Sequence, residues 1–243
     1  MKFKRQKNTL PKGYLLTHYR IEKPIGGGGF SYVYLATDEK TGEPVAIKEY
    51  LPSNQAHRVD DSRVEPLTEE LTTAFRQGIK RFFDEAAALA SINHPNIVRV
   101  INFFRANNTV YMVMRYEQGK DLRAYIKRKS GKLGENAIRA IFPPLLLGLK
   151  ELHNCRLLHL DIKPANIFLR PGGNPLLLDF GAARASVMAS KQAGPYTLTP
   201  GYAPIEQHLG GHVGPWSDLY AIGGSMWSCI SGHAPPAATD RKV

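Results

Sequence analysis

The spacing of the apolar residues changes partway along this 243-residue chain, and that change limits its fold more than any other feature. Runs rich in β-branched and aromatic residues come first, at 19–21, 32–36 and 45–48, with glycine or Thr-Gly-Glu-Pro turn signals between them. Two further runs, 97–104 and 109–116, are joined by an Ala-Asn-Asn turn that is typical of a hairpin. The pattern predicts five strands in a small, mainly antiparallel sheet.

Apolar residues at helical spacing occupy three longer stretches. The first is 72–91, and the proline of Asn-His-Pro-Asn ends it. The second, 136–153, contains Pro143 and Pro144, which predict either a kink or a helix start at that point. The third, 218–230, is apolar almost all round, which predicts a buried helix.

Together these elements predict an α+β chain with a lead-in at 1–18, a sheet-rich part with one helix at 19–116, and a mostly helical part at 117–243. A cleft between two such parts is the expected ligand site, because clefts between domains are favoured for binding. The polar stretch 52–70 lengthens one connection between strand and helix. We expect a surface excursion there in preference to a regulatory loop, because surface insertions cost little.

The formal net charge of +11 raises the question of an anionic partner. The basic residues are scattered, apart from Lys2, Lys4, Arg5 and Lys7, and no RNA-type aromatic motif accompanies them. We therefore expect a solvated basic surface that helps to bind an anionic nucleotide, and no nucleic acid partner.

The chain contains no run close to the ~20 apolar residues that span a bilayer, so no membrane segment is expected within it, although one further downstream is left open. Its two cysteines, Cys155 and Cys229, lie far apart and form no disulfide or zinc pattern. The expected location is the reducing cytoplasm, either for the whole protein or for the cytoplasmic part of a membrane-anchored one. The oligomeric state is not predicted.

Two motifs in the sheet-rich part fit a nucleotide. Four glycines, Gly26 to Gly29, lie between two strands, where glycine backbone approaches phosphates closely; a turn without a ligand is the alternative. Lys48 ends the apolar strand Val-Ala-Ile-Lys, and its partial burial requires anionic partners such as a phosphate and a helix carboxylate. Glu85 fits that second role better than Asp84, and a snorkelling surface lysine is the alternative.

Two motifs in the helical part fit phosphoryl transfer. In His-Leu-Asp-Ile-Lys-Pro-Ala-Asn, Asp161 can orient or deprotonate an attacking hydroxyl, Lys163 can neutralise the transferred phosphoryl group, and Asn166 can hold a metal ion. In Leu-Leu-Leu-Asp-Phe-Gly, Asp179 follows a buried strand and can ligate magnesium. Either aspartate alone is more often a turn or cap residue, but chance assembly of all the motifs in this order is negligible.

The ordered set resembles the bacterial eukaryotic-like (Hanks-type) serine/threonine protein kinases, from about Leu10 to the last residue. The resemblance implies a bilobal protein-kinase fold. Its small lobe has a five-stranded antiparallel sheet and one helix, and its helical lobe is incomplete here. About two dozen residues follow Asp218, whereas the family continues for several helices, so we expect a fragment with exposed apolar surface that a longer chain would cover.

The resemblance also assigns roles to residues. The residues implied in catalysis are Asp161, Lys163, Lys48, Glu85 and Thr199. Those implied in nucleotide binding are Ile25, Gly26, Gly27, Gly28, Gly29, Val33, Ala46, Lys48, Met114, Arg115, Tyr116 and Phe168. The implied metal ligands are Asn166 and Asp179, with ATP and Mg²⁺ as cofactors and Mn²⁺ as an alternative ion.

The implied activity is transfer of the ATP γ-phosphate to serine or threonine hydroxyls of proteins, with autophosphorylation. Lys163 and Thr199 favour serine/threonine over tyrosine specificity. A pseudokinase that binds nucleotide without turnover is the alternative, although such proteins usually lack at least one of the residues present here. A small-molecule phosphotransferase is disfavoured by Thr-Pro-Gly-Tyr and by Glu206, which resembles the family's Ala-Pro-Glu glutamate.

Two residues depart from the family pattern. Ser31 stands in place of the third loop glycine, which is tolerable if its backbone angle is one that other residues adopt. Leu160 stands where the family usually has an arginine that an activation-loop phosphate neutralises. We therefore hypothesise activity without obligatory phosphorylation of hydroxyls such as Ser186, Ser190 and Thr197. Asp218 matches the family's buried aspartate at the start of the central helix.

Overall fold

The computed structural model describes residues 8–129, 131–179, 184–185 and 198–241, with no side-chain detail at 184–185. The chain forms two compact units, Met1–Ser91 with Arg99–Tyr116, and Ile92–Val98 with Glu117–Val243. Each unit is described by itself below. The basic cluster at Lys2 to Lys7 lies outside the described residues.

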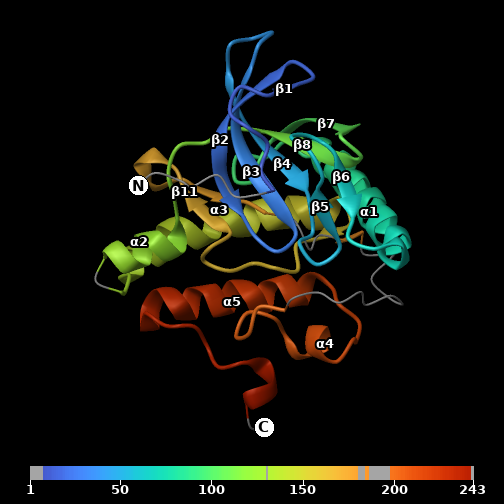
Figure 1. The fold of residues 1–243 in the computed structure, drawn as a ribbon. Coiled ribbons are helices and arrows are strands. Elements are labelled where there is room, and N and C mark those ends of the chain that lie inside the picture. Colours follow the sequence, from blue (N-terminus) through green and yellow to red (C-terminus); the bar gives the residue numbers. More distant parts are fainter. Residues whose placement is uncertain (1–7, 130, 180–183, 186–197, 242–243) are drawn as a thin grey trace. The chain divides into compact units, whose positions relative to one another are not determined.

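The first unit is built on a six-stranded antiparallel sheet (Figure 1). Its order is β1 (Leu15–Leu16), β2 (Tyr19–Gly27), β3 (Ser31–Asp38), β4 (Pro44–Tyr50), β8 (Thr109–Arg115) and β7 (Val100–Ala106). All five predicted strands are confirmed, and β1 is an addition. The fourth predicted strand begins later than expected. Ile97 and Val98 belong to the second unit, where they bond to Leu177.

The lead-in of the chain, up to and including β1, contributes to the core of the sheet. Leu10 and Leu16 are each 2% exposed and join an apolar cluster with residues of β2, β3, β4 and β8. The β7–β8 turn is the predicted hairpin, with Asn107 and Asn108 at φ of 52° and 59°. Asparagine is among the few residues that adopt such angles readily.

The polar stretch that was expected to be a surface excursion is partly buried. It forms the hairpin β5 (Ala56–Arg58) and β6 (Val64–Pro66), and Ala56 and Val64 pack with Leu51 of the chain before it and Phe75. The tip around Asp60 and Asp61 is exposed, as are residues 53–54 before the hairpin and 67–70 after it. The expectation was wrong for the hairpin itself, because two small apolar residues among polar ones are enough to bury it.

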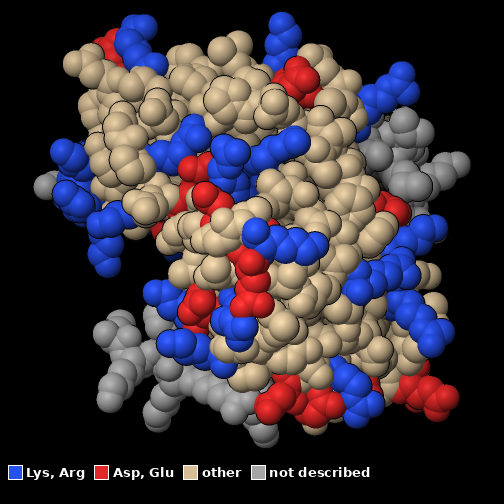
Figure 2. Space-filling model, turned by 90° about the horizontal axis from the view of Figure 1, so that it is seen from above, with Lys and Arg blue, Asp and Glu red and all other residues tan. Residues whose placement is uncertain are grey.

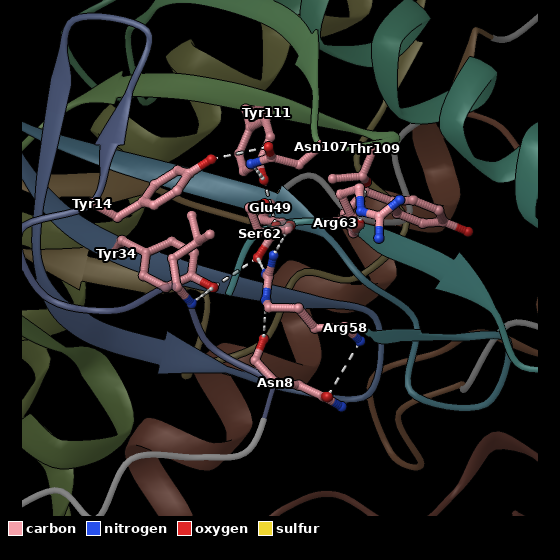
Figure 3. A network of polar contacts seen from close by, with 12 residues as sticks. Asn8, Tyr14, Tyr34, Glu49, Arg58, Ser62, Arg63, Asn107, Thr109 and Tyr111 are labelled. Atoms are coloured by element: carbon pink, nitrogen blue, oxygen red, sulfur yellow. Dashed lines mark hydrogen bonds and ion pairs between the residues drawn. The ribbon is translucent and has the colours of Figure 1, made fainter. Parts of the chain in front are cut away.

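A buried polar network ties this hairpin to the sheet (Figure 3). The Glu49 carboxylate is fully buried and accepts hydrogen bonds from Tyr34 at 2.7 Å, Tyr111 at 2.6 Å and Arg58 at 2.5 Å. Arg58 also donates through Nε to the carbonyl oxygen of Asn8 at 3.1 Å. Burial and the Glu49 charge both raise the pKa of the two tyrosines, so they stay protonated donors.

The predicted first helix is confirmed as α1 (Thr72–Ala90), which a short 3₁₀ turn at Glu69–Leu71 precedes. It packs against β7 and β8 and buries Phe75, Phe82, Ala86 and Leu89. These residues recur at intervals of seven, four and three residues, which is the spacing of one helix face.

The second unit is mostly helical, with α2 (Leu122–Arg128), α3 (Glu135–Asn154), α4 (Ile205–His208) and α5 (Pro215–Ser231). Short strands β9 (Lys120–Asp121), β11 (Ile167–Leu169) and β12 (Pro175–Leu177) form one small sheet, and β10 (Leu157–Leu158) pairs with β13 (Arg184–Ala185). Short 3₁₀ turns lie at Pro171–Gly173 and Ala238–Asp240.

Both predicted helices of this unit are confirmed, with changes in detail. Pro143 and Pro144 lie well inside α3, so they do not mark its start. Helix α5 is buried on one face only, because that face carries the small residues Ala221, Gly224 and Ser225, while Trp227 is 52% exposed. None of the described helices is long and apolar enough to cross a membrane.

Candidate active site

The glycine-rich loop joins β2 to β3 as a tight, exposed turn. Gly26 pairs with Val33 and Gly27 with Tyr32, and the Gly28 amide donates to the Ser31 carbonyl at 3.0 Å. A side chain at Gly27 would meet the Tyr32 ring at 2.9 Å, whereas Gly28 and Gly29 have open space around them. The loop therefore presents bare backbone, which suits the close approach of a phosphate.

Ser31 has no positive φ, so the missing third glycine leaves no strained backbone. The far side of the loop is held by residues that follow β4. The Leu51 amide donates to the Phe30 carbonyl at 3.0 Å, and the Ser53 amide donates to the Gly29 carbonyl at 2.8 Å. The Ser53 hydroxyl also donates to the Gly29 carbonyl, at 3.2 Å. These bonds fix the tip of the loop from outside.

One face of the sheet gathers four of the predicted nucleotide-site residues. Ala46 pairs with Met114 across β4 and β8, and Lys48 pairs with Val33 across β4 and β3. Paired residues point to the same side of a sheet, as do residues two apart on one strand. Val33, Ala46 and Met114 are only partly buried on this face. Arg115, the last residue of β8, is exposed, and Tyr116, which follows it, is partly buried.

Lys48 is 5% exposed and faces α1. Its Nζ lies 5.6 Å from the centre of the Phe82 ring, close enough for a cation–π contact. Glu85 follows Phe82 by three residues and is therefore its neighbour on the same helix face, while Asp84 is exposed. This supports the choice of Glu85 over Asp84 as the helix carboxylate near Lys48.

In the second unit, Asp161, Lys163 and Thr199 form a closed triangle of hydrogen bonds. The Lys163 ammonium donates to the Asp161 Oδ2 at 2.7 Å and to the Thr199 Oγ1 at 3.0 Å. The Thr199 hydroxyl donates to the Asp161 Oδ1 at 2.8 Å. Asn166 donates through Nδ2 to the Asp161 backbone oxygen at 2.8 Å and to Oδ2 at 3.1 Å. Four residues predicted from the sequence thus meet at one carboxylate.

The backbone before Asp161 is strained and braced. Leu160 has a φ of 60°, an uncommon angle for a leucine. The Asp218 carboxylate, fully buried at the start of α5, accepts the amides of His159 at 2.9 Å and Leu160 at 2.8 Å. Gln207 donates to the Leu160 carbonyl at 3.1 Å. This brace sets the direction in which Asp161 points.

His159 completes the brace in its neutral form. Its ring is fully buried, and burial lowers its pKa despite the nearby Asp218 and Asp161. The Asp161 amide donates to Nδ1 at 3.3 Å, so Nδ1 must be the unprotonated nitrogen. Nε2 then carries the proton and donates to the Leu178 carbonyl at 3.1 Å.

The chemistry of Asn166 and Asp179 fits a divalent cation with oxygen ligands. The Leu178 amide donates to the Asn166 carbonyl at 2.8 Å, which ties the residue before Asp179 to Asn166. Because Asn166 uses Nδ2 on Asp161, its Oδ1 is the atom suited to a cation. One amide oxygen and one carboxylate are typical of Mg²⁺, which takes few protein ligands and keeps substrate phosphate oxygens. Asp179 has a φ of 58°.

Comparison with known proteins places the chain in a family. The protein kinase domain profile matches residues 19–243. The chain belongs to the protein kinase domain family. Within this family it is similar to the solved structure "PpkA-294 apo form", with a TM-score of 0.84 and 36% identity over 96% of this chain and 82% of that one. The fold prediction of a bilobal kinase with a helical second part is confirmed.

Bacterial kinases are among the relatives of this kinase-family chain. It is 31% identical to serine/threonine-protein kinase PknL of Mycobacterium tuberculosis over 94% of this chain and 53% of PknL. It is 34% identical to serine/threonine-protein kinase PknA of Nostoc over 89% of this chain and 37% of PknA. The chain thus spans about half the length, or less, of these curated relatives.

The remaining kinase-site predictions have simple placements. Ile25 is exposed at the start of the glycine loop, and Phe168 is partly buried on β11. Glu206 accepts a hydrogen bond from Ser217 at 2.7 Å, which ties α4 to the start of α5. Phe180 and Gly181, with Ser186, Ser190 and Thr197, lie outside the described residues.

Sequence reasoning missed two parts of the brace. Gln207 and His153 support it, the second through Nε2, which lies 2.8 Å from the Asp218 Oδ2. No local pattern marks either residue, because their partners lie tens of positions away. The sequence motif itself could have indicated the role of His159. A histidine two residues before a catalytic aspartate can accept a hydrogen bond from the backbone amide of that aspartate.

Proposed function

We propose that this chain catalyses transfer of the γ-phosphate of ATP to serine or threonine hydroxyls of proteins, including its own. The observation that carries the proposal is the triangle of Asp161, Lys163 and Thr199, with Asn166 bonded to the same carboxylate. Such a cluster brings a base, a fixed cation and an amide together at one carboxylate, as phosphoryl transfer requires.

Asp161 is the base in this proposal. Its carboxylate accepts hydrogen bonds from Lys163 and Thr199, so it is held in one orientation and remains an acceptor for the substrate hydroxyl. The Lys163 ammonium lies beside it and offsets negative charge that develops on the transferred group. Thr199 links the two and fixes the lysine. The residues mainly position and stabilise the reacting groups, with no covalent intermediate.

The first unit contributes the residues that hold ATP. Lys48, with Glu85 as its helix partner, binds the α- and β-phosphates, and the bare backbone of Gly26 to Gly29 covers them. Asn166 and Asp179 of the second unit hold Mg²⁺, or Mn²⁺ in its place. The bound cation supplies charge neutralisation on the phosphates. Because ATP is the donor, we propose that the chain works in the cytoplasm.

We also propose activity that does not require activation-loop phosphorylation. Leu160 carries no charge that a phosphate would need to neutralise, and Asp218 and Gln207 hold its backbone. Alanine substitution of Ser186, Ser190 and Thr197, one at a time, should leave peptide phosphorylation within about threefold of the parent, since no charge pair is lost. A complete loss that an acidic residue restores would show that a phosphate is required.

A pseudokinase is the second candidate, and the presence of Lys48, Asp161, Asn166 and Asp179 together disfavours it. The test is transfer of phosphate from Mg-ATP to three peptides that differ only in carrying serine, threonine or tyrosine. We expect transfer to the serine and threonine peptides only, reduced about 10²–10⁴-fold in Asp161→Asn, because that variant loses the base. Nucleotide binding without transfer to any of the three peptides would favour the pseudokinase.

A further inference from the structure

A dense cluster of positive charge, in addition to the one at the N-terminus, lies at α2. Residues 120–132 contain six basic residues and one acidic residue, a net charge of +5 out of +11 for the whole chain. We call this set the α2 basic surface, and its members are Lys120, Arg123, Lys127, Arg128, Lys129 and Lys132. The basic residues are therefore less scattered than the sequence analysis expected.

All six side chains are exposed, while Leu122 and Ile126 fill the buried face of the helix. Figure 2 shows several blue side chains together at the left edge, the side on which Figure 1 has α2. Asp121, the only acidic residue in this stretch, accepts the Ala124 amide at 2.8 Å as the cap of α2, and its Oδ1 also lies 3.8 Å from the Arg123 Nε. One carboxylate is too few to neutralise six cations.

The α2 basic surface is joined directly to the catalytic loop. The Arg123 amide donates to the Pro164 carbonyl at 3.2 Å, and Pro164 lies three residues after Asp161. Strand β9 pairs with β11, so that Lys120 lies opposite Leu169 and Asp121 opposite Phe168. The middle of the loop that carries Asp161, Lys163 and Asn166, and the strand that follows this loop, are thereby tied to the start of α2.

Helix stability explains only part of this charge. Lys127 and Arg128 are in the last turn of α2, where cations favour the negative end of the helix dipole. Lys120 precedes the helix and Arg123 is in its first turn, where a cation is unfavourable. Lys132 lies beyond it. Binding of an anionic partner would explain the presence of all six basic residues, including those that do not stabilise the helix.

We propose that the α2 basic surface binds acidic segments of the protein substrates, and so gives this kinase a preference for acceptor sites flanked by aspartate or glutamate. The inference rests on the proposed kinase function and adds a substrate class to it. Clustered like charges attract an oppositely charged partner and speed its association, and they favour acidic over neutral sequences.

The geometry limits where the acidic residues must lie. Asp161 to Pro164 spans at most about 11 Å of chain, and the seven residues of α2 add about 10 Å. An extended peptide advances about 3.3 Å per residue, so roughly six residues reach from the acceptor hydroxyl to the end of α2. Acidic residues within about six positions of the acceptor should matter, and more distant ones should not.

The test compares two threonine peptides of equal length, one with glutamates near the acceptor and one with glutamines in their place. Substrates are assayed with the parent chain and with Arg123→Gln/Lys127→Gln/Arg128→Gln. The matched control is Lys12→Gln/Lys40→Gln/Lys80→Gln, which removes three exposed charges from the first unit. Glutamine suits an exposed helix position, so α2 should stay folded.

We expect the parent to show a KM about tenfold lower for the acidic peptide, with the same kcat for both, because exposed charges each contribute a few-fold at most. The α2 variant should lose this difference and the control should keep it. The difference should also shrink as salt rises from about 0.05 M to about 0.5 M. Equal KM values in the parent, or an equal loss in the control, would overturn the proposal.

A binding measurement separates this inference from the proposed function. A fluorescent acidic peptide should bind the parent more tightly than the α2 variant whether or not phosphate is transferred. Binding without transfer would leave the docking surface standing and reject the kinase activity. If the α2 variant instead lost affinity only for vesicles of anionic lipid, the surface would be a membrane contact and the proposal would be wrong.

Discussion

Glu49 shows how a single buried charge organises the first unit. The residue follows Lys48 on β4, and its side chain points to the opposite face of the sheet, where Arg58, Tyr34 and Tyr111 surround it. These contacts join β4 to three other segments of the chain, of which the one with Tyr111 lies 62 residues away. A buried ion pair is weak proof of net stabilisation, but removal of one partner leaves an uncompensated charge.

Removal of Arg58 should therefore be costly. We expect Arg58→Ala to lower the free energy of unfolding by about 3–5 kcal/mol, since it leaves Glu49 buried without its cation. Arg63→Ala is the control, because Arg63 is exposed and pairs with the exposed Asp60, and this change should leave the free energy of unfolding nearly unchanged. Urea unfolding measures both. Similar losses in the two variants would mean that Glu49 does not depend on Arg58.

The buried neutral His159 should make stability depend on pH. Its pKa is lowered in the folded chain, so the unfolded chain binds more protons once pH falls below the ordinary histidine range. The stability that neutral His159 contributes is present above pH ~6.5 and is lost as pH falls below it. The melting temperature between pH 7.5 and pH 5.5 should fall further for the parent than for His159→Gln. Parallel curves would contradict a neutral buried ring.

At the scale of elements, the sequence was a good guide wherever periodicity was strong. The helices α1, α3 and α5 and the five main strands appear where alternating or helical spacing predicted them. The β5–β6 hairpin was missed, because Ala56 and Val64 are too few to form a pattern. Burial of α5 on one face only was also missed, since the inward face consists mainly of small residues and both tryptophans of the helix are exposed.

The residues of the candidate active site likewise differ in how well the sequence predicted them. A motif with fixed local spacing predicted Asp161, Lys163 and Asn166, which lie within six residues of one another, and the resemblance to serine/threonine kinases added Thr199 to the cluster. The supports of that cluster were harder to find. Gln207 and His153 act through hydrogen bonds across long stretches of chain, and a single sequence carries no signal for such pairs.

For the molecule as a whole, two findings bear on function together. The match to the protein kinase domain profile covers residues 19–243, and the chain retains the lysine, base and metal-ligand positions that the resemblance implies. Charge is also unevenly distributed, with a net +5 in thirteen residues beside the catalytic loop. The first finding names a reaction class, and the second suggests which proteins are its substrates.

The central claim is that this chain transfers phosphate, and intact-mass analysis after incubation with magnesium and ATP tests it most directly. We expect the mass to rise in steps of one phosphate, at serine or threonine residues, only when Asp161 is present, and Asp161→Asn to stay unmodified under the same conditions. An unchanged mass in the parent, or equal gains in both proteins, would contradict the assignment of Asp161 as the base of a working kinase.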